Sequence, residues 1–117
     1  MVDMKIRTKK FAVDCWNLCS QLPKTREYNN LVFQLLKSSS SVAANWRASQ
    51  RPKSEADFIN KLKIVEEEAD ETCFWLELII EIRDEDTTEV ERLWKECDEL
   101  LRITVASIKT TKNKQVK

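Results

Sequence analysis

The chain has 117 residues, of which 42% are hydrophobic and 34% charged, and its twenty Lys and Arg residues balance twenty Asp and Glu residues. This length predicts one domain, residues 1–117, with its own hydrophobic core. The zero net charge disfavours nucleic-acid binding through an overall excess of basic charge. The chain contains no glycine. Hairpin turns and phosphate-binding loops usually need glycine, so a sheet-rich or nucleotide-binding fold is disfavoured.

Apolar runs along the chain are short, as in Leu78-Ile79-Ile80, and none could span a bilayer. The N-terminal sequence Met-Val-Asp-Met-Lys does not have the pattern of a signal peptide. We therefore expect a cytoplasmic protein that does not associate with membranes.

A first helix is predicted from about Thr8 to Leu22, and Pro23 ends it. Its apolar side chains recur at spacings of four, three and four, at Phe11, Cys15, Leu18 and Leu22.

A second helix is predicted from about Glu27 or Asn29 to Gln50. Its middle, residues 38–44, consists almost entirely of serine and alanine, and serine competes with a helix for backbone hydrogen bonds. A three-helix variant with this segment as a loop is the alternative. We favour a helix because small side chains let a neighbouring helix approach closely. The inward stripe also stays in phase, through Leu31, Leu35, Ser38, Val42, Asn45 or Trp46, and Ser49.

Two capping-box patterns open the remaining helices. Ser54-Glu55-Ala56-Asp57 follows Pro52 and starts a third helix that continues to about Arg83, and Thr88-Glu89-Val90-Glu91 starts a fourth. The inward stripe of the third is Phe58, Leu62, Val65, Ala69, Thr72 or Cys73, Leu76 and Ile79; that of the fourth is Leu93, Cys97, Leu100, Thr104 and Ile108. The fourth helix is predicted to end near Lys109, before a polar, frayed tail at about 110–117.

Short connections between long amphipathic helices favour antiparallel neighbours. The predicted fold class is therefore all-α, an antiparallel up-down-up-down four-helix bundle.

The second half of the third predicted helix is apolar nearly all round, although a bundle core needs only one stripe about 100° wide. The surplus indicates a subunit interface, because tryptophan and other large apolar residues are enriched at such contacts. A wide core stripe with some tolerated exposure is the alternative. The interface candidates are Trp46, Phe74, Trp75, Leu78 and Ile82.

Charge is segregated along the chain, with ten basic and three acidic residues in 1–54, five and seventeen in 55–99, and five and none in 100–117. In an up-down bundle the start of the first helix and the ends of the second and fourth share one pole. One hypothesis is an RNA-binding or ribosome-associated factor that binds RNA weakly through this basic pole; cations that complement helix dipoles are the alternative. The candidate nucleic-acid-binding residues are Lys5, Lys9, Lys10, Arg47, Arg51, Lys53, Lys109 and Lys112, with Arg7, Lys114 and Lys117 at the same pole.

No catalytic chemistry is indicated. Residues 66–71 carry five carboxylates that resemble those of a di-iron bundle, but such sites pair glutamate with histidine, and the chain has no histidine. Serine nucleophiles would likewise have no histidine base. The cysteines, Cys15, Cys19, Cys73 and Cys97, have the spacing of helix-face residues, and we interpret them as small buried hydrophobes, with a thiolate metal site as the alternative. We expect no enzyme activity, cofactor, bound metal or small-molecule substrate.

Four stretches carry a family resemblance: Leu22-Pro23, residues 41–47 (Ser-Val-Ala-Ala-Asn-Trp-Arg), residues 53–58 (Lys-Ser-Glu-Ala-Asp-Phe) and residues 67–76 (Glu-Glu-Ala-Asp-Glu-Thr-Cys-Phe-Trp-Leu). The chain resembles the bacterial four-helix-bundle proteins encoded in 23S rRNA intervening sequences, a family that includes the accessory variability proteins of diversity-generating retroelements. The resemblance implies an up-down bundle, a homopentamer and no catalytic activity. In the retroelement members it implies binding to a reverse transcriptase and nucleic acid. Those members are strongly basic, whereas this chain is not, and Ala48 stands where the family usually has glutamate.

Overall fold

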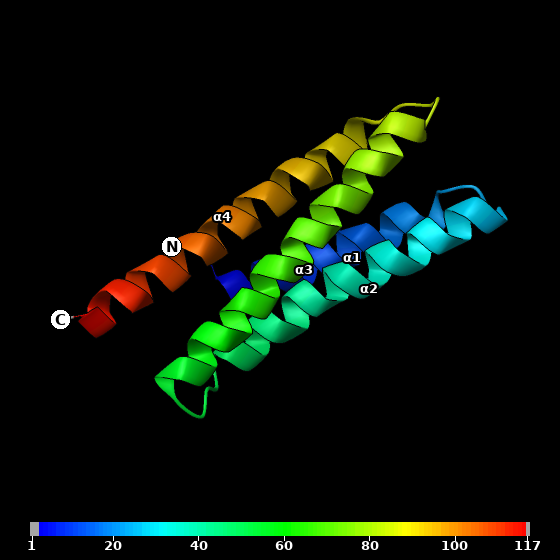
Figure 1. The fold of residues 1–117 in the computed structure, drawn as a ribbon. Helices are drawn as coiled ribbons and strands as arrows, with labels where there is room; N and C mark the ends of the chain where they lie inside the picture. The colour runs from blue at the N-terminus through cyan, green and yellow to red at the C-terminus, as the bar shows by residue number, and fades with distance from the viewer. Residues whose placement is uncertain (1–2, 117) are drawn as a thin grey trace.

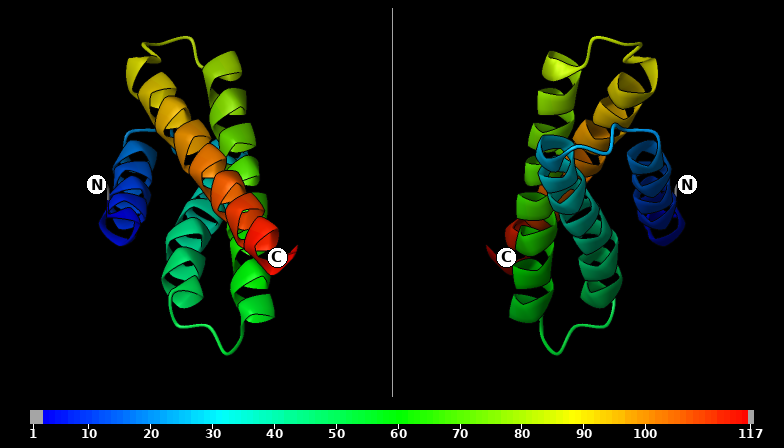
Figure 2. Two further views of the ribbon diagram at one scale, coloured as in Figure 1. Left: turned by 90° about the vertical axis from the view of Figure 1, so that its left-hand side faces the viewer. Right: turned by 90° about the vertical axis from the view of Figure 1, so that its right-hand side faces the viewer.

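The computed structural model describes residues 3–116, and within this range the chain forms four α-helices joined by three short loops (Figure 1). The helices are α1 (Met4–Ser20), α2 (Arg26–Ser49), α3 (Glu55–Ile82) and α4 (Thr88–Val116). Each helix runs antiparallel to the next, and α2–α3 and α3–α4 form the most extensive contacts (Figures 1 and 2). The predicted up-down-up-down four-helix bundle is confirmed. The molecule is elongated, measuring 52 × 21 × 21 Å.

The core follows the predicted stripes closely, because burial recurs at the helical spacing of three and four residues. All five residues expected to face inward on the fourth helix are buried. On α3 the first core position differs by one residue, since Ile59 is 7% exposed whereas the predicted Phe58 is only half-buried. None of the helices in residues 3–116 has a stretch long and apolar enough to cross a membrane.

The serine-rich segment of α2 is helical, so the three-helix alternative is wrong. Ser38 and Ser39 are each 1% exposed. The Ser38 hydroxyl accepts a hydrogen bond of 2.9 Å from the Thr72 hydroxyl of α3 and donates one of 3.4 Å to the Leu35 carbonyl of its own helix. The hydroxyls of Ser38 and Thr72 thus both have hydrogen-bond partners at the α2–α3 contact. A larger side chain at this contact would separate the two helices.

The first helix starts earlier in the chain than predicted, because its N-cap residue is Asp3. At α1 the Asp3 carboxylate accepts hydrogen bonds from the Lys5 and Ile6 amides, so the helix begins at Met4 rather than near Thr8. An aspartate at the N-cap stabilises the first turn in this way.

The predicted capping boxes of α3 and α4 also deviate from the ideal pattern. The Ser54 hydroxyl accepts from the Asp57 amide at 3.0 Å as predicted, but the Asp57 carboxylate accepts from the amide of Lys53, at 2.9 Å, rather than that of Ser54. At α4 the Asp86 carboxylate accepts hydrogen bonds from the Thr88 amide at 3.0 Å and from the Thr88 hydroxyl at 2.6 Å. The Glu91 amide donates to the Thr87 carbonyl at 2.9 Å rather than to the Thr88 hydroxyl, so the predicted box does not form.

The last helix continues to Val116, well past Lys109, and the predicted frayed tail is helical over 110–116. Within this segment the Thr111 hydroxyl donates to the Ser107 carbonyl of the same helix at 2.9 Å. Lys117 of the predicted basic pole lies outside the described residues.

Candidate interaction surfaces

An apolar strip runs along the outside of α3, and we call Phe74, Trp75, Leu78 and Ile82 the α3 strip. Phe74 is 53% exposed and Ile82 is 46% exposed, while Trp75 and Leu78 are half-buried. The rings of Phe74 and Trp75 meet edge to face with their centroids 5.0 Å apart, and the Trp75 indole donates to the Glu71 carboxylate at 3.2 Å. Four of the predicted interface residues therefore form one ordered surface.

The fifth predicted interface residue, Trp46, lies elsewhere. It is 9% exposed and belongs to the hydrophobic core. Trp46 is four residues after Val42 and three before Ser49, which are both buried, so it shares their stripe. Trp46 is therefore a core residue of the single chain and does not belong to the α3 strip.

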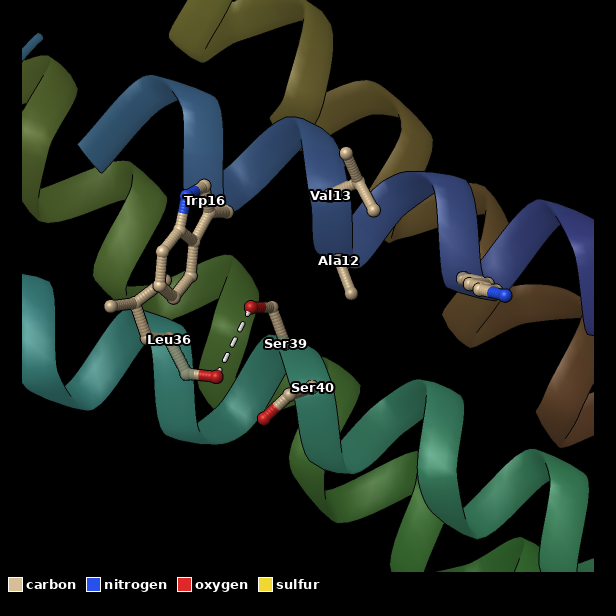
Figure 3. Close-up of a pocket in the computed structure, with 7 residues that line it drawn as sticks. Ala12, Val13, Trp16, Leu36, Ser39 and Ser40 are labelled. Atoms are coloured by element: carbon tan, nitrogen blue, oxygen red, sulfur yellow. Dashed lines mark hydrogen bonds between the residues drawn. The ribbon is translucent and has the colours of Figure 1, made fainter. Parts of the chain in front are cut away.

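A second apolar surface, which the interface prediction missed, lies between α1 and α2. Trp16 is 65% exposed and Val13 is 50% exposed, and both line a hollow of about 370 Å³ beside Leu36. Figure 3 shows the Trp16 indole extending from α1 over Leu36 of α2. The hollow exists because the facing residues are small, namely Ala12, Ser39 and Ser40.

Two further hollows extend this surface along the same pair of helices, and we call the three together the α1–α2 groove. Toward the α2–α3 loop the lining residues are Lys5, Lys9, Ala12, Ser40, Ala43, Ala44 and Arg47. Toward the α1–α2 loop they are Trp16, Cys19, Ser20, Lys24, Val32 and Leu36. The groove is thus apolar along its centre and basic at both ends.

The predicted basic pole is only partly assembled. Lys5, Lys9 and Arg47 line one hollow of the groove. Arg51 and Lys53 lie in the α2–α3 loop, and Lys109 and Lys112 lie on the last turns of α4; these two segments lie toward the same end of the bundle (Figure 1). Glu55 and Asp57 start α3 at this end and reduce its positive charge.

Two cations of the predicted basic pole turn away from the groove, toward α4. The Arg7 guanidinium binds both carboxylate oxygens of Glu96, at 2.7 and 2.8 Å, and lies 3.1 Å from Glu99. These hydrogen bonds, chiefly the one to Glu96, raise the pKa of Arg7. Lys10 pairs with Asp14 at 3.1 Å. Arg7 is therefore held by carboxylates of α4, whereas Lys10 is 70% exposed and shares the Asp14 carboxylate with Arg92.

The ion pairs that join different helices in residues 3–116 all connect α1 with α4. Besides Arg7 with Glu96 and Glu99, Arg92 of α4 lies 3.2 Å from Asp14 of α1 and 2.6 Å from Glu89 of its own helix. The hydrogen bond to Glu89 is the main cause that raises the pKa of Arg92 and lowers that of Glu89. Because α1 and α4 share the smallest packed contact, these pairs orient α1 on the bundle.

The four cysteines are buried, as predicted. Burial raises the pKa of Cys15 and raises that of Cys19 to about 11. For Cys97 the hydrogen bond with Cys73 is the larger cause of a raised pKa, followed by burial, and its thiol lies 3.1 Å from the Ala69 carbonyl oxygen. The thiolate, which is the nucleophilic and metal-binding form, is therefore disfavoured. Within residues 3–116 no three potential metal ligands are grouped to hold an ion.

Together these features define an all-α protein with two exposed apolar surfaces, the α3 strip and the α1–α2 groove, on one four-helix bundle. The chain belongs to the family of 23S rRNA-intervening sequence proteins, which it matches over residues 2–106. This confirms the resemblance seen in the sequence.

One solved structure is similar over nearly its whole length. It is the crystal structure of a protein with unknown function from the S23 ribosomal protein family of Bacteroides thetaiotaomicron VPI-5482. That protein is 34% identical, with a TM-score of 0.84, and the similarity covers 92% of this chain and 99% of the other. No curated protein is significantly similar to the chain.

Proposed function

We propose that this protein is a non-catalytic, cytoplasmic bundle that works as a homo-oligomer, assembled through the α3 strip. The observation that carries the proposal is the exposure of Phe74 and Ile82 on a regular helix whose opposite face already fills the core. Contiguous apolar surface of this kind commonly marks a protein interaction site. The α3 strip contains two aromatic residues, which are typical anchors of such contacts.

The proposed assembly is a pentamer, and the family resemblance is its basis. Family membership and the structural neighbour support a bundle without assigned chemistry. The buried thiols and the lack of histidine in the chain also leave no recognisable nucleophile and base pair.

Light scattering on the purified full chain at micromolar concentration tests this proposal. We expect a mass near five times the 13.8 kDa of one chain. A particle of 13.8 kDa would contradict self-association. An assembly of another size would support self-association and correct the stoichiometry.

A second candidate function is weak binding of RNA by the basic end of the bundle. The observation that favours it is that Arg51 and Lys53 of the α2–α3 loop lie at the same end of the bundle as Lys109 and Lys112 of α4 (Figure 1), and none of these four cations forms an ion pair within residues 3–116. Repetition around a closed oligomer would multiply a weak contact with phosphates.

The RNA proposal predicts binding that is independent of sequence and strongly dependent on salt. Reversing Arg51, Lys53 and Lys112 to glutamate should abolish a gel shift with structured RNA while helicity and particle mass stay unchanged, because these three exposed cations do not line the α1–α2 groove. The log–log salt slope of the wild type should be about −2 to −3 for three phosphate contacts per protomer. A matched control reverses three exposed cations away from this end, Arg26, Lys37 and Lys95, and should retain binding. Equal loss in both variants would indicate a general charge effect, and no wild-type shift at low salt would refute RNA binding.

A further inference from the structure

We propose that the α3 strip of one copy docks in the α1–α2 groove of the next copy, so that the two surfaces are the two halves of one repeating contact. This inference rests on the proposed homo-oligomer and names what covers its strip. An alternative arrangement would pair two α3 strips face to face.

The shapes of the two surfaces are complementary. The α3 strip projects large side chains, with Phe74 and Trp75 stacked edge to face at its centre. The α1–α2 groove is hollow at its middle because small residues face each other there, and its walls are the apolar side chains Trp16, Val13 and Leu36. Bulky side chains entering a hollow lined by small ones give the dense packing found in interface cores.

The charges of the two surfaces are also complementary. The groove carries Lys5, Lys9 and Arg47 at one end and Lys24 at the other, and none of its lining residues in the described part of the chain is acidic. Beside the α3 strip lie acidic residues at helical spacing. Glu71 is hydrogen-bonded to Trp75, and Glu67 lies one turn before it. Two α3 strips in contact would bring these carboxylates together, whereas strip and groove bring opposite charges together.

Several carboxylates lie close together near the α3 strip, and they affect the pKa of Glu68. Burial is the main cause that raises the pKa of Glu68, and the neighbouring Glu71 and Glu67 add to it. Lys37 of α2 opposes this effect, because it lies close enough to favour the charged carboxylate. Further cations from a partner's groove would relieve the same repulsion.

The groove is lined by residues of α1, α2 and the loop between them, and none of its described lining residues belongs to α3. One molecule can therefore use its α3 strip and its groove at the same time. Such a contact is heterologous: each copy offers its strip to one neighbour and its groove to the other. Heterologous contacts form closed rings when the rotation between copies closes. The proposed pentamer is of this kind, while pairing of identical strips would stop at a dimer.

Strip-to-groove docking can be distinguished from pairing of two strips by mixing a variant with a disrupted α3 strip and a variant with a disrupted groove. The strip variant carries Phe74→Lys and Ile82→Lys, and the groove variant carries Trp16→Glu; all three positions are at least 46% exposed, so the bundle should fold. We expect each variant alone to be monomeric. Their mixture should form a 1:1 complex of twice the 13.8 kDa chain mass, because one intact strip and one intact groove remain. Val105→Glu, at a 42% exposed position of α4, is the matched control and should keep the wild-type mass.

Several results would overturn the inference. If Trp16→Glu keeps the wild-type mass, the groove is not used, although the proposed homo-oligomer would stand. A mixture that stays monomeric while the wild type is oligomeric also refutes strip-to-groove docking. A second groove variant, Lys9→Glu with Arg47→Glu, checks that any loss comes from the groove rather than from misfolding, and it should pair with the strip variant in the same way. A monomeric wild type would remove the homo-oligomer itself.

Discussion

Replacing Phe74 and Ile82 with lysine is expected to reduce the particle from an oligomer to the 13.8 kDa chain. Both side chains are about half exposed in the isolated bundle, so the substitution exposes no core. Full burial of a large apolar side chain contributes about 1.5–3 kcal/mol, and about half of each side chain remains to be buried, so the pair contributes about 1.5–3 kcal/mol to each contact. That range corresponds to a loss of about one to two orders of magnitude in affinity. Light scattering over a dilution series measures it directly.

The matched control for this loss is Val105→Lys, which adds positive charge at a partly exposed apolar position of α4 outside both surfaces. It should leave the particle mass unchanged. Far-UV circular dichroism should show the same helicity for the wild type and for both variants. An unchanged mass in the Phe74→Lys, Ile82→Lys variant would exclude the α3 strip as the assembly surface and leave its exposure unexplained.

The bundle was predictable from the sequence because one physical signal, the recurrence of apolar residues every three or four positions, persists through all four helices. It even held across residues 38–44, where propensity favours a loop, since Ser38 and Ser39 fall on the buried stripe. Helix ends were less predictable. Asp3, Asp57 and Asp86 each accept from a backbone amide at a position other than the one that the pattern indicated.

Of the two surfaces, the sequence revealed only the one with an excess of apolar residues. The second half of α3 has more large side chains than a core stripe can hold, so exposure of Phe74 and Ile82 followed. Trp46 is buried because its phase on the helix places it on the core stripe, whereas its residue type alone suggested an interface. Trp16 is the opposite case, because it is 65% exposed. It directly follows the buried Cys15 and lies about 100° further around α1, away from the core stripe.

The partners of the charged residues were not predictable from position along the chain. Arg7, Lys5 and Lys9 all start the first helix, yet Arg7 binds Glu96 of α4 while Lys5 and Lys9 line the groove beside α2. Successive residues are 100° apart around a helix, so neighbours in sequence face different helices. Grouping by helix end therefore overestimated the positive charge available at the basic pole.

Leu76→Ala should destabilise the bundle by about 2–5 kcal/mol, the usual cost of a cavity left by a buried leucine. Leu76 is fully buried, two residues from the half-buried Leu78 of the α3 strip. To keep association from adding to the measured free energy of unfolding, the substitution is made in the Phe74→Lys, Ile82→Lys background. Urea unfolding followed by circular dichroism gives the difference at constant slope. In the same background Val105→Ala, at a 42% exposed position, should change the free energy of unfolding by less than about 1 kcal/mol. Equal changes in the free energy of unfolding for Leu76→Ala and Val105→Ala would contradict the placement of Leu76 in the core. They would also contradict the division of α3 into a buried stripe and a surface that binds a partner.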